Sequence, residues 1–113
     1  MKKNILTFPT PAAPMPATID AQLRSAIAGK RLIQFTYNQQ PRVAEPHDYG
    51  QRNGIDKLLV YQRTKAGTYI TGWRSLELGK IHNLVVLDDT FSGTREQSHQ
   101  DHLNWDVLYA RVE

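Results

Sequence analysis

The sequence predicts a mainly β protein with a short N-terminal helix, followed by about five strands in a small antiparallel barrel or strongly bent sheet. Two patterns predict it. Apolar residues recur with a helical period up to residue 29, and they alternate with a period of two from residue 30 onward. Turn residues then follow at the close spacing typical of small all-β domains. The length of 113 residues corresponds to one domain with one modest core.

The helix is predicted between Thr18 and Gly29. Ile19, Leu23 and Ile27 recur every four residues, which gives the helix one apolar face. The Thr18 side chain can cap the first turn, and glycine suits the position after the last turn.

Alternating apolar residues predict five strands after the helix. They cover residues 31–38, 42–50, 57–64, 68–78 and 80–89. The pair Asn53-Gly54 lies in a predicted turn between the second and third strands. Pro46 is expected to end or bend the second strand, and Gly72 to bend the fourth.

Both ends of the chain are expected to lie outside the barrel domain, which is assigned to residues 18–95. Clustered prolines predict a disordered, proline-rich arm over residues 1–17. Residues 96–113 are assigned to an acidic C-terminal segment. Within it, residues 104–112 fit a strand or a helix, and a short helix is the preferred interpretation.

Composition and motifs exclude several classes of protein. The chain has no cysteine, so disulfides, cysteine zinc sites and thiol nucleophiles are excluded. No apolar stretch approaches the roughly 18 residues of a membrane span. Phosphate-loop, dinucleotide-binding, serine-hydrolase and zinc-protease motifs are absent. We therefore expect a cytoplasmic, non-enzymatic protein without a cofactor or a membrane partner.

Charge is unevenly distributed along the chain. Residues 1–87 hold twelve basic and five acidic residues, a net charge of +7, whereas residues 88–113 hold two basic and six acidic ones, a net charge of −4. Such a division suggests a polyanionic partner, or an acidic tail that folds over a basic surface.

Basic and aromatic residues are the candidates for binding a ligand or nucleic acid. Cations contact phosphates, and aromatic rings stack single-stranded bases. The candidates are Arg42, Arg74, Lys80, Trp73, Tyr37 and His47, with Arg31 and Arg63 as outer ones. The first three come from three strands and are expected to converge in a basic groove. Core packing is the favoured interpretation for both aromatic rings.

Two further clusters have residue types that are used in catalysis or metal binding. Glu45, His47 and Asp48 could serve in acid–base catalysis, but turn formation at the end of a strand is the favoured interpretation. His99 and His102 have the spacing of two metal ligands on one helical face. No third ligand is indicated, and we expect solvated histidines and no metal.

The order of these features resembles the WYL domain over residues 19–95. The resemblance rests on AIAGKR at the helix end, Phe35-x-Tyr37, RVxEP at 42–46, KLLVY at 57–61, LELGKI at 76–81 and LxVL at 84–87. Lys57 and Leu58 stand where the family has its Trp and Tyr, so the chain resembles a divergent, stand-alone member.

The resemblance implies an Sm-like, SH3-type barrel. It also implies a regulatory domain of bacterial transcription regulators that senses nucleic acid or a nucleotide-like ligand, in transcriptional or defence regulation. Arg42 and Lys80 are the positions that match the family's basic ones. The alternative is a protein-interaction accessory domain that has lost its ligand groove. We also expect a homodimer, because the apolar C-terminal residues follow a polar linker and have little core to join.

Overall fold

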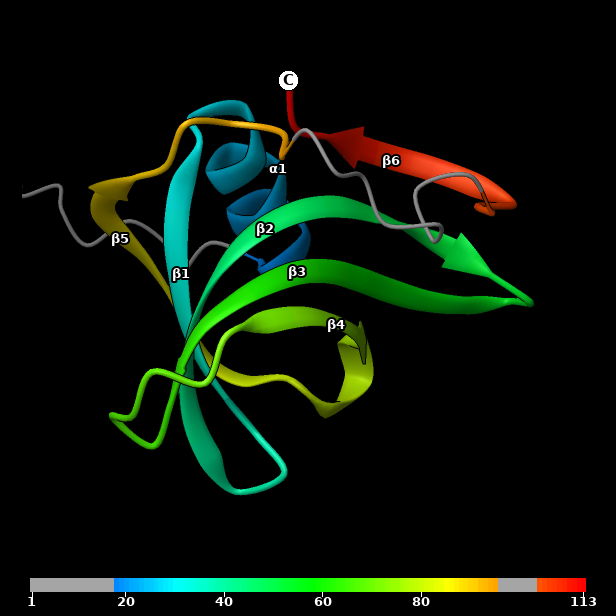
Figure 1. Ribbon diagram of the computed structural model, residues 1–113. Coiled ribbons are helices and arrows are strands. Elements are labelled where there is room, and N and C mark those ends of the chain that lie inside the picture. Colours follow the sequence, from blue (N-terminus) through cyan, green and yellow to red (C-terminus); the bar gives the residue numbers. More distant parts are fainter. Residues whose placement is uncertain (1–17, 96–103) are drawn as a thin grey trace, which may run out of the picture.

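The chain is mainly β in a computed structural model that describes residues 18–95 and 104–113. In these residues one α-helix precedes six antiparallel strands (Figure 1). The strands form one sheet that does not close into a barrel, with β4 and β5 at its two ends. The predicted proline-rich arm, residues 1–17, lies outside the described residues.

Helix α1 (Ile19–Ala28) confirms the helix predicted from the sequence. The Thr18 hydroxyl accepts a hydrogen bond from the Ala21 amide at 3.1 Å and caps the first turn. Leu23 and Ile27 are buried, and the apolar face packs against β1, β2, β5 and β6.

The strands follow the predicted order, with one addition at the C-terminal end. They are β1 (Arg31–Tyr37), β2 (Gln40–Arg52), β3 (Ile55–Lys65), β4 (Gly72–Glu77), β5 (His82–Thr90) and β6 (Val107–Arg111), with a 3₁₀ helix η2 (Leu78–Lys80) before β5. The sheet order is β4-β3-β2-β1-β5, and β6 pairs with β2. The turn at Asn53-Gly54 is confirmed, with φ of 53° and 77°.

Strand β2 is long and changes its partner along one edge. It pairs with β3 over nearly its whole length, whereas its other edge pairs with β1 over residues 40–44 and with β6 over residues 48–51. Pro46 lies at this change of partner, beside an irregularity in the pairing with β3 before Asp48. The strand therefore continues through the proline, which sits where the ladder is already interrupted.

The preferred helix at residues 104–112 is wrong. Val107–Arg111 forms β6 along the free part of the β2 edge (Figure 1). A Cβ atom at Gly50 would collide with the carbonyl oxygen of Val107 and lie 2.8 Å from the Trp105 ring. The two strands approach so closely only because residue 50 is glycine. Residues 104–113 thus extend the sheet and are no separate segment.

The fourth strand is also shorter than predicted. It begins at Gly72, and residues 66–71 form a loop after the turn at Ala66-Gly67. The core lies between α1 and one face of the sheet, and Leu23, Ile33 and Phe35 are its largest buried members. In the part of the chain that the structure describes, no helix is long and apolar enough to cross a membrane.

Candidate anion-binding site

Arg42 and Arg74 lie on one face of the sheet. Arg74 pairs with Val60 across β4 and β3, and Gln62, two residues further along β3, shares that face. The guanidinium of Arg42 donates to Gln62 Oε1 at 3.1 Å, so Arg42 reaches the same face from β2. Two of the three cations that were predicted to converge thus share one face of the sheet.

Arg42 is buried, with 8% of its surface exposed. Its Nη2 donates to the carbonyl oxygen of Tyr37 at 3.2 Å, and the guanidinium lies 5.4 Å from the centroid of the Tyr37 ring. Its Nε is buried and has no hydrogen-bond partner among the residues that the structure describes. A buried guanidinium with an unpaired donor is costly to maintain, so Arg42 is held in place by the hydrogen bonds of its other nitrogens.

The two arginines face no carboxylate. The ion pairs between described residues include neither Arg42 nor Arg74. Burial lowers the pKa of the Arg42 guanidinium, and the neighbouring charge of Arg74 lowers it further. The two positive charges therefore repel one another, and an anion between them would be stabilised by both.

Tyr37 confirms the interpretation that it is a packing residue with a bonded hydroxyl. Its ring packs against the core, and its hydroxyl accepts a hydrogen bond from the Glu77 amide at 3.2 Å. Glu77 directly precedes η2, so Tyr37 contacts Arg42 through its ring and carbonyl oxygen and the start of the helical turn that carries Lys80 through its hydroxyl.

Lys80 belongs to a neighbouring hollow and not to the arginine pair. The hollow has a volume of about 500 Å³ and is lined by Asn38, Gln39, Gly79, Lys80 and His82. The Lys80 side chain is 60% exposed and lies 3.7 Å from Glu77, which neutralises part of its charge. The predicted groove of three converging cations is therefore reduced to a pair, with Lys80 beside it.

Trp73 and His47 lie together, away from the arginine pair. Trp73 pairs with Tyr61 across β4 and β3, so its ring is on the opposite face from Arg74. Its ring centroid lies 4.8 Å from that of His47, which is fully buried. Trp73 thus packs against other rings, as favoured from the sequence, and the burial of His47 removes it from the surface on which a ligand contact was expected.

The carboxylates beside His47 are engaged in ion pairs. Glu45, 2% exposed, accepts from Arg63 at 2.7 Å and from Arg95 at 3.0 and 2.8 Å. Arg95 also lies over the Tyr61 ring, 3.5 Å from its centroid. Arg63, an outer candidate for the groove, is therefore a partner of Glu45.

Asp48 has a similar structural role. It is fully buried, and both of its oxygens accept hydrogen bonds of 3.1 Å from Arg111. The Trp105 indole donates to the same carboxylate at 3.0 Å. Asp48 therefore holds the C-terminal strand in place. Both basic residues of the segment 88–113, Arg95 and Arg111, thus bind acidic residues of the body, whereas its Asp88 pairs with Arg31, an outer candidate for the groove, at 3.0 Å.

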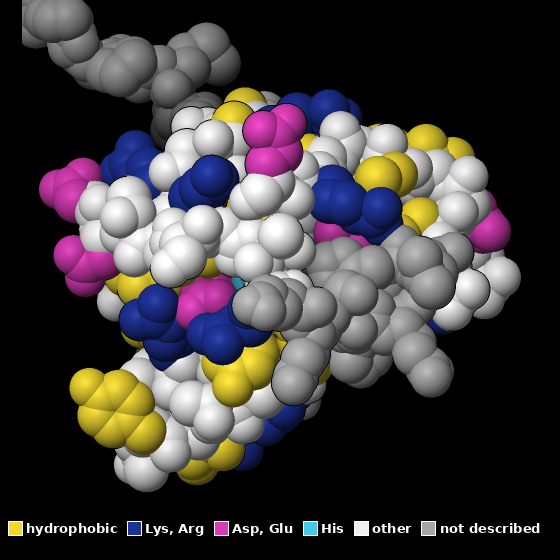
Figure 2. Space-filling view, turned by 45° about the horizontal axis from the view of Figure 1, so that its top comes forward, with side chains coloured by type: hydrophobic (Ala, Val, Ile, Leu, Met, Phe, Trp, Pro, Cys, Tyr) yellow, Lys and Arg dark blue, Asp and Glu magenta, His cyan; other side chains and the backbone are white. Residues whose placement is uncertain are grey.

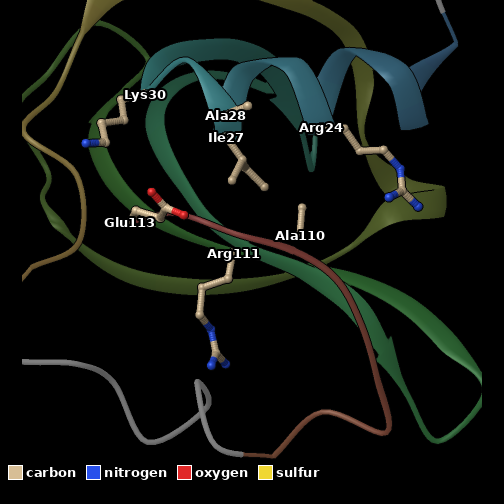
Figure 3. Close-up of a pocket in the computed structure, with 7 residues that line it drawn as sticks. All are labelled: Arg24, Ile27, Ala28, Lys30, Ala110, Arg111 and Glu113. Carbon is tan, nitrogen blue, oxygen red and sulfur yellow. The ribbon is translucent and has the colours of Figure 1, made fainter.

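A second cavity lies between α1 and the C-terminal strand (Figure 3). It has a volume of about 280 Å³, and its basic lining residues are Arg24, Lys30 and Arg111. Figure 3 shows that the three charged ends point in different directions. Arg24 is bound to Asp20 at 3.1 Å, and Arg111 to Asp48. These cations do not converge on a ligand.

The surface in Figure 2 shows Lys and Arg side chains scattered among acidic and apolar ones. The positive charge of residues 1–87 is thus not gathered into one continuous patch on this face, and the local pairing of each cation decides its role. No group of three or more potential metal ligands occurs among residues 18–95 and 104–113. His99 and His102 lie outside the described residues.

Sequence reasoning missed two residues of this region. Gln62 occupies a position between core residues of β3, and its amide binds Arg42 on one side and the Ile70 carbonyl, at 2.7 Å, on the other. A glutamine at an apolar position in the alternation of β3 was the signal for it. Tyr69 was assigned to a strand, whereas it lies in the loop over residues 66–71 and is 84% exposed.

No known protein family, no curated protein and no solved structure matches this chain.

Proposed function

We propose that this chain is a non-enzymatic regulatory module that binds an anionic ligand, single-stranded nucleic acid or a nucleotide, at Arg42 and Arg74. The observation that carries the proposal is that the two arginines lie on one face of the sheet and form no ion pair with a carboxylate among the described residues. Guanidinium groups bind phosphate oxygens through paired hydrogen bonds, and a bound phosphate would relieve the repulsion between the two charges.

The resemblance to WYL domains supports the same function, because Arg42 and Lys80 match basic positions of that family. A helix followed by an antiparallel sheet is consistent with the Sm-like module that the resemblance implies. In this proposal the chain acts in the bacterial cytoplasm, in transcriptional or defence regulation, and the hollow beside Lys80 receives a further part of the ligand.

Binding without catalysis is proposed because the candidate catalytic groups are engaged elsewhere. Glu45 and Asp48 are buried and hydrogen-bonded to arginines, so their charges are used in holding the fold together. General acid–base catalysis needs a group within reach of a substrate proton.

Fluorescence polarisation with a labelled single-stranded oligonucleotide at low salt tests the proposal. Arg74→Gln removes one charge of the pair and should weaken binding about tenfold, in line with a charge-assisted contact to phosphate. Arg24→Gln removes the same charge from the half-exposed surface of α1 and should leave affinity nearly unchanged. Equal affinities of the three proteins, or no binding by any, would refute the proposal.

Exposed apolar residues favour a second candidate, a protein-interaction module or homodimer. Ile55, Val107 and Leu108 are 44%, 47% and 42% exposed, at neighbouring ends of β3 and β6. The apolar C-terminal residues, which first suggested a homodimer, pair with β2 of their own chain. The exposed side chains of these three residues are therefore the reason to expect a dimer or a protein partner. Light scattering of the intact protein tests it: a monomer mass at high concentration would exclude the dimer, and Leu108→Asp should abolish a dimer mass if one is found.

A further inference from the structure

An exposed aromatic ring, Tyr69, is carried by a loop that is hydrogen-bonded to the same glutamine as Arg42. We propose that Tyr69 stacks on an unpaired base of the nucleic acid held by the two arginines, so that the site selects single strands over duplexes. This proposal rests on the proposed function and names its ligand class. Its three supports are the exposure of Tyr69, the attachment of its loop to Arg42, and the charge of the surrounding strands.

Tyr69 differs from the other tyrosines of the described residues. Tyr37 and Tyr49 pack in or against the core, Tyr61 lies under Arg95, and Tyr109 donates to Asp56 at 2.9 Å. Tyr69 is 84% exposed, so both faces of its ring are open to a planar partner. Stacking of bases on such rings is sequence-tolerant and is a common part of single-strand recognition.

The loop that carries Tyr69 is fixed to the arginine pair through one buried side chain. Gln62 is 1% exposed, accepts from Arg42 at 3.1 Å and donates to the carbonyl oxygen of Ile70 at 2.7 Å. Two backbone hydrogen bonds between Lys65 and Thr68, at 3.0 and 3.1 Å, close the Ala66-Gly67 turn just before Tyr69. The backbone is therefore fixed on both sides of Tyr69, and the loop is tied to the glutamine that binds Arg42.

The segments nearest the loop carry no negative charge, and the acidic residues Glu45, Asp56 and Glu77 lie further along β2, β3 and β4. Residues 31–44 and 57–76 contain six basic and no acidic residues. Lys65 pairs with Arg42 across β3 and β2, at the root of the loop. A phosphate backbone drawn to Arg42 and Arg74 meets no carboxylate from these two segments on its way to Tyr69.

A base can stack on a protein ring only when it has left the duplex. In a double strand both faces of each base are covered by its neighbours, whereas bases in a single strand can be splayed out. Phosphate contacts alone would bind both forms, so Tyr69 is the residue that would distinguish them.

The test compares three ligands of equal phosphate number: single-stranded oligo(dT), an abasic oligonucleotide, and a duplex. The wild type should bind oligo(dT) about tenfold or more tightly than the abasic strand, as expected for one stacked base. Tyr69→Ala should bind the two equally, and Tyr69→Phe should retain the preference. Val85→Ala, which shortens another exposed apolar side chain on β5, should behave as the wild type.

The outcomes separate this proposal from the one on which it rests. If all ligands bind in an Arg74-dependent manner with equal affinity, the arginine site stands and stacking by Tyr69 is refuted. If Tyr69→Ala loses affinity for the abasic strand as well, the ring acts on the loop structure and stacking is again refuted. If no nucleic acid binds, the proposed function fails and this proposal fails with it. The melting temperature of Tyr69→Ala should equal that of the wild type, since the ring is exposed.

Discussion

Arg111 binds both carboxylate oxygens of Asp48, across 63 positions of the chain, and so joins the C-terminal strand to the middle of β2. Asp48 has no exposed surface, whereas the Arg111 side chain is 39% exposed. The buried negative charge of Asp48 is therefore neutralised by a guanidinium that reaches it from the partly exposed strand β6.

Arg111→Ala should destabilise the protein strongly, because it leaves the buried carboxylate of Asp48 without its guanidinium partner. Loss of one partner from a buried pair costs about 3–5 kcal/mol. Urea unfolding followed by circular dichroism measures the change, and Arg111→Lys should lie between the alanine variant and the wild type. Lys80→Ala, which breaks the exposed pair with Glu77, should leave the unfolding midpoint nearly unchanged. An Arg111→Ala midpoint equal to that of Lys80→Ala would contradict this role.

Because of the Asp48–Arg111 pair, removing the C-terminal segment is a poor test of its effect on ligand binding. Cutting the chain after Thr94 would remove Arg111 and β6 together, so the loss of stability would obscure any effect on ligand binding. Point substitutions in β6 are the cleaner choice.

Gly50→Ala should loosen β6 from β2. The added methyl group would collide with the backbone of Val107, and overpacking of this kind costs typically about 1–3 kcal/mol. Hydrogen exchange should show faster exchange of the β6 amides than in the wild type. Gly79→Ala is the matched control, since a Cβ there meets nothing within 4 Å. Unchanged protection of the β6 amides in Gly50→Ala would contradict the close contact between Gly50 and the backbone of Val107.

Acid should weaken the fold through Glu45. Burial raises the pKa of this carboxyl, but hydrogen bonds from Arg95 and Arg63 outweigh it, and the pKa lies below its ordinary value of 4.5. A carboxyl with a lowered pKa in the folded state stabilises the fold above its ordinary pKa, and this contribution is lost as the pH falls through the lowered value.

The free energy of unfolding, measured between pH 7 and pH 3, should therefore fall on acidification below about pH 4.5. Glu45→Gln should be less stable at pH 7 and should show a flatter profile at acidic pH. Glu77→Gln, at an exposed pair, should keep the wild-type profile. A Glu45→Gln profile parallel to that of the wild type throughout would rule out this carboxyl as the source.

The local pattern of the sequence was enough to predict the helix and five of the strands. The apolar spacing of Ile19 and Leu23 and the turn at Asn53-Gly54 are local signals, and the structure confirms both. The strand conformation of residues 107–111 is not determined by their local sequence. It depends on the free edge of β2 and on the small size of Gly50. Periodicity cannot show which edge is open.

The candidate site was predicted in part for the same reason. Arg42 and Arg74 meet because their strands lie on either side of β3, which the strand order implied. The burial of His47 and the ion pair of Arg63 depend on partners distant in the sequence, such as Phe91 and Glu45. Charge counting treats every cation as free, whereas the fold places several of them in specific ion pairs, such as Arg63 with Glu45 and Arg111 with Asp48.

Arg42 itself requires a conservative substitution. The side chain is buried and hydrogen-bonded to Gln62, so Arg42→Ala would disturb the core as well as remove the charge. Arg42→Lys keeps the charge and removes the forked donor, and it should weaken binding less than Arg74→Gln if the folded structure is retained.

The salt dependence of nucleic-acid binding tests the central claim most directly. The slope of log affinity against log salt concentration should be negative for the wild type with a single-stranded oligonucleotide. In Arg74→Gln it should be shallower by roughly 0.7, the loss expected for one phosphate contact on a single strand. Arg24→Gln should keep the wild-type slope. A slope that is unchanged by Arg74→Gln, or an affinity that does not depend on salt, would contradict an anion site at Arg42 and Arg74.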